Sequence, residues 1–398
     1  MDVLHFKNNP QNRDIISLFS GAMGLDIGLA KAGLNIAVGQ DFDSACVATM
    51  RANGHNVLDG DIRCIEPVDL LGMTGLAPGE PFLICGGPPC QPFSTAGKRL
   101  GINDPRGSLF MDFIRMIDYI RPRFFIMENV KGIISAPLKH VPLEEQDVND
   151  PKQKPGTVLE IILSEFEKLG YKTVYGVLDA VNYGVPQFRE RFVLIGSRDN
   201  EDIFLPLPTH FQMHQDPAYR WRTLGDTIRD LEQHCGECAV FSEDRLAFLK
   251  LVPEGGNWKD LPLELKKKAM GGALESGGGK VGFYRRLSYN QPSPTLVTSP
   301  VQKATMMCHP TQNRPLSIRE YARIQQFPDN WIFIGTNAER YRQIGNAVPI
   351  GLAEALGKAI LSVADKSAAI QTKRFRGTDI HQKLKIALEI GGSCRVNK

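Results

Sequence analysis

A cysteine on a turn is the residue of this chain whose position points most directly to chemistry. Cys90 follows the sequence Gly-Gly-Pro-Pro, which comes directly after the apolar run 82–85. A thiolate held at the end of a buried strand can attack a ligand bound there. A cysteine in a reducing compartment is more often a small buried apolar residue, and we interpret Cys46, Cys64 and Cys85 in this way. For Cys90, context alone leaves both interpretations open.

A carboxylate, Glu128, and two guanidiniums, Arg189 and Arg191, are further candidates for the same site as Cys90. Glu128 follows the apolar run 124–127, where a general acid or base would face a ligand and where a carboxylate could equally cap the next element. Arg189 and Arg191 are two residues apart, so an extended chain places both on one face. Such arginines can orient a carboxylate or a nucleobase carbonyl. The alternative is an ordinary pair of salt bridges at a sheet edge.

A glycine-rich turn near the start of the chain is suited to a nucleotide-like cofactor. Phe19, Gly21 and Gly24 belong to the sequence Phe-Ser-Gly-Ala-Met-Gly, between an apolar run and a segment with helical spacing. Asp41 follows about 20 residues later, where an acid can bind a pair of ribose hydroxyls. The glycine spacing does not match the full dinucleotide fingerprint, and the chain has no P-loop sequence.

A Cys-Gly-Glu-Cys sequence raises the question of a metal. Cys235 and Cys238 have the spacing of half a zinc site. No second pair matches them, and Cys308-His309 is the one remote candidate. We therefore expect no metal.

Strands and helices alternate over residues 14–197. The apolar runs that predict strands are 14–19, 36–38, 82–85, 124–127, 172–178 and 191–195. Helical spacing appears between them and again at 317–326 and 350–363. This alternation predicts an α/β fold with a doubly wound, mainly parallel sheet. Ligands of such sheets bind at the carboxyl ends of the strands, where Asp41 and Glu128 are expected. Residues 198–300 are rich in Pro and Gly and predict a second, smaller, loop-rich lobe.

Length and composition are those of a soluble globular protein. The chain has 398 residues, of which 42% are hydrophobic and 23% charged, which excludes whole-chain disorder and a coiled coil. Eight cysteines are too few for a disulfide scaffold. The N-terminus carries no apolar signal segment and no run of about 18 apolar residues occurs, so we expect a cytoplasmic protein without a membrane span.

The charge is concentrated at the C-terminus. The whole chain carries +3, whereas the tail from residue 366 holds eight Lys and Arg against two acids, a net +6. A basic tail can bind a polyanionic partner. The alternative is a solvated terminus.

Six motifs occur in an order that resembles DNA (cytosine-5)-methyltransferases of the bacterial type. The resemblance covers 14–197 and 284–360. The motifs are Asp14–Gly21, Gly86–Ser94, Glu128–Val130, Gln187–Arg191, Arg314–Pro328 and Gln343–Pro349. One departure is Met23, where the family usually has glycine.

The resemblance implies a role for each candidate residue. Cys90 would attack cytosine C6, Glu128 would hold and protonate N3, and Arg189 and Arg191 would orient the base and the glutamate. The methyl donor would be S-adenosylmethionine, with no metal. Asp41 would bind its ribose, while Phe42 and Asp61 would contact its adenine. The implied cofactor residues are Phe19, Gly21, Gly24, Asp41, Phe42, Asp61, Pro89, Leu109, Asn346, Ala347 and Val348.

The resemblance also implies an organisation and partners. Residues 1–197, completed by 341–365, would form the catalytic and S-adenosylmethionine-binding domain. Residues 198–340 would form the target-recognition lobe and hinge, and 366–398 the basic tail. The enzyme would be a monomer that flips a cytosine out of double-stranded DNA, with a restriction endonuclease as a further partner. Two alternatives are a transfer-RNA cytosine-5 methyltransferase on the same fold and a catalytically inactive DNA-binding regulator.

Overall fold

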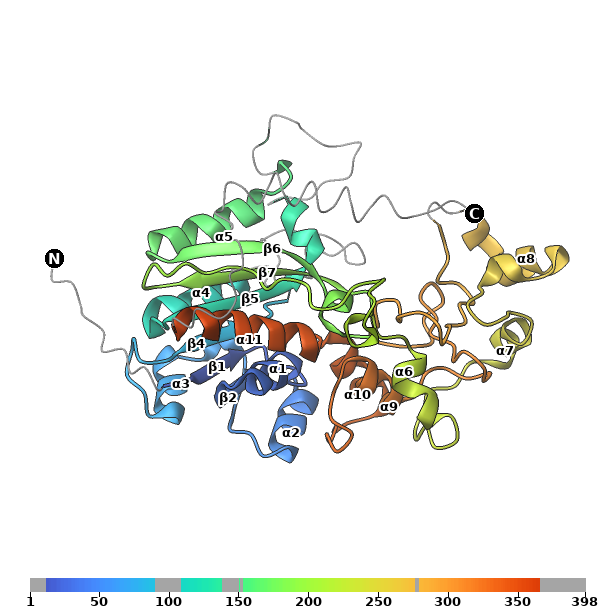
Figure 1. The fold of residues 1–398 in the computed structure, drawn as a ribbon, viewed down its shortest axis with the longest axis horizontal. Helices are drawn as coiled ribbons and strands as arrows, with labels where there is room; N and C mark the ends of the chain where they lie inside the picture. Colours follow the sequence, from blue (N-terminus) through green and yellow to red (C-terminus); the bar gives the residue numbers. More distant parts are fainter. Residues whose placement is uncertain (1–11, 90–108, 138–149, 151–152, 276–278, 366–398) are drawn as a thin grey trace.

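The computed structural model describes residues 12–89, 109–137, 150, 153–275 and 279–365 (Figure 1). In this part of the chain, seven strands form one sheet in the order β3-β2-β1-β4-β5-β7-β6. The strands are β1 Asp14–Leu18, β2 Asn35–Asp41, β3 Val57–Asp59, β4 Leu83–Gly86, β5 Phe124–Val130, β6 Lys172–Asp179 and β7 Glu190–Ser197. The pairs from β3 to β5 are parallel, and β7 is antiparallel to β5 and β6.

Helices cover both faces of this sheet, as the doubly wound prediction requires. The helices of the sheet lobe are α1 Gly24–Ala32, α2 Ser44–Ala52, α3 Pro67–Thr74, α4 Leu109–Ile120, α5 Thr157–Lys168 and α11 Ile350–Ala364. One core lies under α3, α4 and α5 and includes the stacked pair Phe125 and Phe166. The other lies under α1 and α11 and includes Leu29 and Leu356. The prediction of a mainly parallel α/β fold is confirmed.

Helices α1 and α11 lie in close contact because glycines face small residues. A Cβ on Gly357 would lie 2.6 Å from the Ala32 side chain, and a Cβ on Gly28 would collide with Ala353. The C-terminal helix is therefore part of the sheet lobe, although more than 300 residues separate it from α1 in the sequence.

Each of the six apolar runs corresponds to a strand, whereas β3 has no counterpart among the predicted runs, and one boundary difference is informative. Glu128 lies inside β5, opposite Val193 of β7, rather than after the end of the strand. Antiparallel pairing with β7 extends β5 beyond its apolar residues, so Glu128 is fixed by strand hydrogen bonds. Most of the polar stretch 136–156 lies outside the described residues.

Met23 shows why glycine suits its position. It is the residue before α1 and has a left-handed backbone, with φ of 67°, which costs a non-glycine residue on the order of 1 kcal/mol. Its side chain is completely buried in the core that α2 and the second lobe share. Burial of a methionine offsets this strain.

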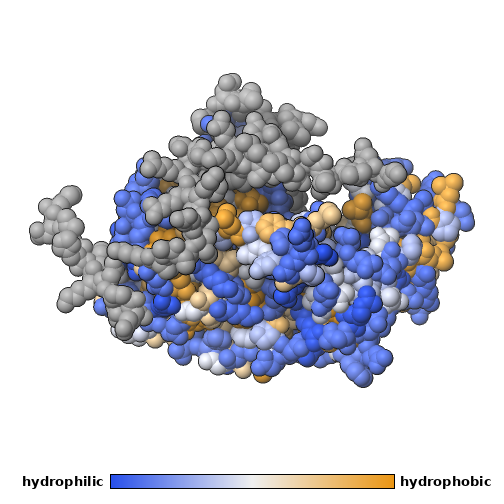
Figure 2. Space-filling model, viewed as in Figure 1, coloured by the Kyte–Doolittle hydropathy of each residue, from blue (hydrophilic) through white to orange (hydrophobic). Residues whose placement is uncertain are grey.

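The second lobe has its own helices. They are α6 Gly225–Ile228, α7 Glu243–Leu249, α8 Leu263–Met270, α9 Ile318–Ile324 and α10 Asn337–Asn346. Figure 1 shows α9 and α10 beside the sheet lobe and α7 and α8 at the far end. On the face seen in Figure 2, most described surface residues are hydrophilic, and apolar residues gather at this far end. Leu263 of α8, for example, is 81% exposed.

One described stretch, Asn337–Ala364, is long and apolar enough to cross a membrane by length and composition. It consists of α10 and α11 with Pro349 between them, and 61% of its apolar window is buried inside the protein. Residues of α11 belong to the core beneath the sheet. The stretch is a core element of the fold.

Candidate active site

The predicted site residues converge at one edge of the sheet. Strands β1, β2, β4 and β5 are parallel, so all four end at this edge, and the antiparallel β7 begins there. The glycine-rich turn follows β1, Asp41 ends β2, and Glu128 and Arg191 are in β5 and β7. Residues more than 100 positions apart in the chain thereby face one region.

Glu128 and Arg191 form an ion pair at this edge. Arg191 Nε lies 2.7 Å from Glu128 Oε1, and the two side chains are 12% and 11% exposed. Burial raises the pKa of Glu128, and the nearby guanidiniums of Arg191 and Arg189 oppose this rise. A carboxyl group whose neutral form is favoured by burial is suited to hold a proton for a ligand.

The glycine-proline turn after β4 lies directly against Glu128. A Cβ on Gly87 would lie 3.0 Å from Glu128 Oε2, so glycine permits this approach. Asn129 donates a 2.9 Å hydrogen bond to the Pro88 carbonyl and ties the turn to β5. Cys90 itself lies outside the described residues; its neighbour Pro89 is exposed.

Cys85 has the properties of a structural thiol. Its side chain is completely buried in β4, and burial raises its pKa far above the ordinary value. Such a thiol stays protonated and does not act as a nucleophile. Cys46 is likewise buried with a raised pKa, whereas Cys64, which we expect to be buried, is exposed. Cys64 is the last residue of a short helical turn after β3, and the residue that this turn buries is Ile62.

The glycine-rich turn and the end of β2 form one unit. Asp41 accepts hydrogen bonds from the backbone N–H groups of Gly21, at 2.8 Å, and Asp43, at 2.9 Å. Phe19 and Gly21 both have positive φ, which bends the chain sharply after β1. A Cβ on Gly21 would meet no atom within 4 Å, so the turn borders open space. Each oxygen of Asp41 keeps a second lone pair, and these residues therefore fit a ribose-bearing cofactor.

The residues predicted to contact adenine differ in exposure and in hydrogen bonding. Phe42 is 66% exposed, so its ring is available to stack on a planar ligand. Asp61 accepts hydrogen bonds from the backbone and Nε of Arg63, at 3.0 and 2.9 Å, which lower its pKa. An adenine amine would share this carboxylate with Arg63. Leu109, at the start of α4, is partly buried against the core of the sheet.

The segment Asn346–Val348 returns to the sheet lobe as the resemblance implies. A Cβ on Gly24 would collide with the Val348 carbonyl, so this segment packs against the first residue of α1. Ala347 and Val348 are each 8% exposed, and Asn346 is exposed. The segment thus borders the glycine-rich turn.

The two arginines of the predicted pair have different partners. Arg191 faces Glu128, whereas Arg189 is 2% exposed and donates to the carbonyls of Leu296 and Gly345. Gln325, which was not predicted as a site residue, is buried and accepts a hydrogen bond from Gln187, two residues before Arg189. Its place in the motif 314–328 was the available signal.

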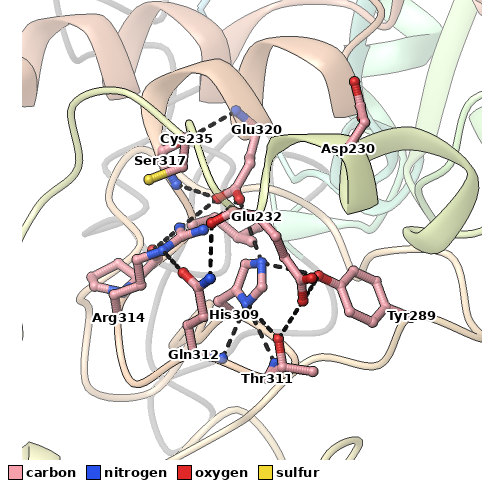
Figure 3. A network of polar contacts seen from close by, with 12 residues as sticks. Asp230, Glu232, Cys235, Tyr289, His309, Thr311, Gln312, Arg314, Ser317 and Glu320 are labelled. Atoms are coloured by element: carbon pink, nitrogen blue, oxygen red, sulfur yellow. Dashed lines mark hydrogen bonds and ion pairs between the residues drawn. The ribbon is translucent and has the colours of Figure 1, made fainter.

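Among the described residues, no three His, Cys, Asp or Glu side chains gather as a metal site requires. The side chain of His309 instead joins a buried polar network (Figure 3). Its Nε2 lies 3.2 Å from the Tyr289 hydroxyl, and its Nδ1 accepts from the backbone N–H of Gln312 at 3.1 Å. Cys235 appears in the same view, and its thiol lies 3.5 Å from the Gly236 carbonyl.

The sheet order and the site at its carboxyl edge define the fold of S-adenosylmethionine-dependent methyltransferases. A crystal structure of a prophage-encoded protein from E. coli has this fold, with a TM-score of 0.60 and 22% identity over 88% of this chain and 99% of that one. The family model for C-5 cytosine-specific DNA methylase matches residues 13–362, and the chain belongs to this family. It is an enzyme, a DNA (cytosine-5)-methyltransferase.

Curated relatives agree over most of the chain. Type II methyltransferase M.PspPI of Psychrobacter sp. is 42% identical over 357 residues, which are 87% of this chain and 78% of the relative. Type II methyltransferase M.Sau96I of Staphylococcus aureus is 38% identical over 363 residues, which are 91% of this chain and 78% of the relative. The family expectation from the motifs is confirmed.

Proposed function

We propose that this enzyme transfers a methyl group from S-adenosylmethionine to C5 of a flipped-out cytosine in a specific double-stranded DNA sequence, through a covalent bond between Cys90 and C6. The observation that carries the proposal is the buried Glu128–Arg191 pair. Gly87 lies against the Glu128 carboxylate, and Asn129 holds the adjacent Pro88 by a hydrogen bond. Cys90 follows this turn by two residues. A base held by the pair would therefore lie beside the chain that bears the thiol.

The chain's residues have distinct parts in the reaction. The Cys90 thiolate adds to C6, and the electron pair of the C5–C6 bond moves toward N3 and makes C5 nucleophilic. Protonated Glu128 delivers its proton to N3, and Arg191 holds the carboxylate that results. S-adenosylmethionine supplies the electrophilic methyl group. Loss of the C5 proton to solvent and departure of the Cys90 thiolate then restore the C5–C6 double bond, and N3 returns its proton to Glu128.

The cofactor residues would be those around the glycine-rich turn. Asp41, fixed by Gly21 and Asp43, would bind the ribose hydroxyls, and the exposed Phe42 would stack near the adenine. Asp61 would accept from the adenine amine. The remaining contacts would come from Phe19, Gly24, Pro89, Leu109, Asn346, Ala347 and Val348.

The relatives' description as Type II methyltransferases supports a proposal for the cellular setting. We place the enzyme in the modification half of a restriction-modification system, in the cytoplasm, as a monomer on DNA. A restriction endonuclease with the same target sequence would be its partner. Within the chain, 1–197 with 341–365 would carry the chemistry, 198–340 the recognition and hinge, and 366–398 a basic tail.

Covalent trapping tests the proposal. Base-resolution methylation mapping in cells that express the enzyme first identifies the target sequence. DNA that carries 5-fluorocytosine at the target should then form a stable adduct that requires S-adenosylmethionine, because fluorine cannot leave C5 as a proton does. Mass spectrometry should place the adduct on Cys90. Cys90→Ser should form little adduct, since a hydroxyl is far less ionised than a thiol near neutral pH.

Cys85→Ser is the matched control, because that thiol is buried in β4 and is not expected to react. It should trap DNA as the wild type does. An adduct on another cysteine, or a stable adduct in Cys90→Ser, would refute the mechanism. Trapping on RNA in place of DNA, or the absence of methylation in mapped DNA, would contradict the proposed DNA substrate.

A further inference from the structure

Arg189 makes contacts that differ in kind from those of Arg191. Its two terminal guanidinium nitrogens donate to main-chain carbonyls, Nη1 to Leu296 at 2.9 Å and Nη2 to Gly345 at 2.7 Å. These acceptors are 107 and 156 residues away in the sequence. Its backbone N–H donates to Asp179 at 2.8 Å, which fixes the start of β7. Both terminal nitrogens of the guanidinium thus bind the protein itself.

Two buried glutamines extend these contacts into a junction, which we define as Gln187, Arg189, Leu296, Gln325 and Gly345. Gln187 accepts from the Leu296 backbone at 2.8 Å and donates to Gln325 at 3.0 Å. Gln325, at the end of α9, donates in turn to the carbonyls of Ile344 at 2.8 Å and Ala347 at 3.1 Å. Both glutamine side chains are completely buried.

Each arm of the junction leads to a part of the proposed active site. Two residues after Arg189, Arg191 pairs with Glu128. Directly after Gly345 comes the segment Asn346–Val348, which packs against the cofactor turn at Gly24. Leu296 belongs to the second lobe, whose Ser293 is paired with Gln187. The junction therefore joins the base-holding strand, the cofactor segment and the recognition lobe.

The junction allows little movement. A Cβ on Gly345 would lie 2.5 Å from the Val297 carbonyl, so the end of α10 already lies directly against the backbone at Val297. A buried guanidinium that loses its acceptors is costly, and so are carbonyls that lose their donor. These groups consequently hold one relative placement.

We infer that Arg189 is a positioning residue, which fixes the segment Asn346–Val348 of the cofactor pocket relative to the Glu128–Arg191 pair. The inference rests on the proposed function for the identity of the pocket. It assigns Arg189 no contact with the base, in contrast to the role that the family resemblance implies. Its effect on the reaction acts through the cofactor segment.

Arg189→Met and Arg189→Lys test this inference, with Arg191→Met for comparison. The measurements are the dissociation constant of S-adenosylhomocysteine by calorimetry, and kcat with KM for S-adenosylmethionine. Arg189→Met should weaken S-adenosylhomocysteine binding at least tenfold and raise KM, because the segment after Gly345 loses its anchor. Arg189→Lys, which still reaches one carbonyl, should recover part of this loss. Arg191→Met should lower kcat at least 100-fold and change S-adenosylhomocysteine binding less than twofold.

A matched control is Arg286→Lys. Arg286 is also buried and donates to carbonyls, among them those of Val252 and Leu249, but it lies within the second lobe. Its variant should lower stability and leave S-adenosylhomocysteine binding unchanged. If Arg189→Met does not fold, Arg189→Lys tests the inference alone. It should bind S-adenosylhomocysteine more weakly than the wild type, with a nearly unchanged kcat at saturating S-adenosylmethionine.

Three outcomes are distinguishable. Wild-type binding of S-adenosylhomocysteine in the Arg189 variants would overturn the positioning role, and loss of kcat alone, as in Arg191→Met, would return Arg189 to the base. Failure of the wild-type enzyme to bind S-adenosylhomocysteine would instead refute the proposed function.

Discussion

One carboxyl group near the glycine-rich turn, that of Asp26, is buried without a charged partner in the described structure. Asp26, in α1 below the cofactor turn, is completely buried. Neither carboxylate oxygen has a hydrogen bond of ordinary geometry in the structure, although the Ser17 hydroxyl lies near. Burial raises its pKa to about 6. The ionised group therefore lowers the stability of the folded protein near neutral pH.

Asp26→Asn should stabilise the enzyme in a pH-dependent way. The folded pKa lies above the unfolded one, so the native state binds the extra proton and wild-type stability falls as pH rises from about 4 to about 6. Above this window the cost reaches on the order of 3 kcal/mol, and the neutral amide avoids it. Urea unfolding at pH 4.5 and pH 8 should show an advantage of the variant that grows with pH. A variant less stable at pH 8 would mean that another group compensates the buried charge.

At the scale of elements, the network in Figure 3 fixes the start of α9. Glu320 closes a capping box with Ser317 at this helix end and binds Arg314 through both oxygens, at 2.8 and 2.7 Å. His309 Nδ1 accepts backbone N–H groups, so its proton is on Nε2, which faces Tyr289 and Glu320. A second proton on the ring would oppose these donors. Burial lowers the pKa of His309 to about 4.

Protonation of His309 should therefore destabilise the fold in mild acid. The folded pKa lies below the unfolded value of 6.5, so the unfolded state binds more protons and stability is lost as pH falls from about 6.5 toward 4. The loss from this residue is on the order of 3 kcal/mol. His309→Gln should remove this part of the pH dependence of the urea midpoint, measured from pH 7.5 to 4.5. A difference in stability that is the same at every pH does not affect this comparison. Parallel pH curves for variant and wild type would contradict the assignment.

At the scale of the whole molecule, two cores divide the second lobe. One includes Leu249, Leu261 and Tyr284 around α7 and α8 and contains residues of this lobe alone. The other joins Leu296 and Tyr321 to Met23 and further residues of the sheet lobe. Helices α9 and α10 are therefore packed on the catalytic side of the molecule. The outer part, around α7 and α8, is the more independent unit.

Exchange of residues 198–300 for the equivalent region of a relative should change the methylated sequence and preserve methyl transfer, because every chemical motif lies outside this stretch. Base-resolution mapping of chimera-modified DNA measures the change. Exchange of 240–284 alone is the control, since it leaves the shared core intact and should cost less stability. Chimeras that keep the original target would place recognition elsewhere.

Local patterns in the sequence predict six of the seven described strands and the motif residues. Apolar runs must be buried, so they defined β1, β2, β4 and β5, and the end of β2 gave the position of Asp41, whereas Glu128 lies within β5. These are local signals, because the period of the apolar residues selects strand or helix before any distant contact forms.

Only the tertiary structure decided which side chains meet. Arg189 and Arg191 have the same type and the same expected face, yet one meets two carbonyls and the other a carboxylate. Their partners are brought in by segments 50 or more residues away, and Gln325 likewise meets Gln187, which is 138 residues away. The position of a residue along a strand decides which face its side chain points to. Its partner depends on the segment that packs against that face, and this packing results from burial of apolar residues throughout the chain.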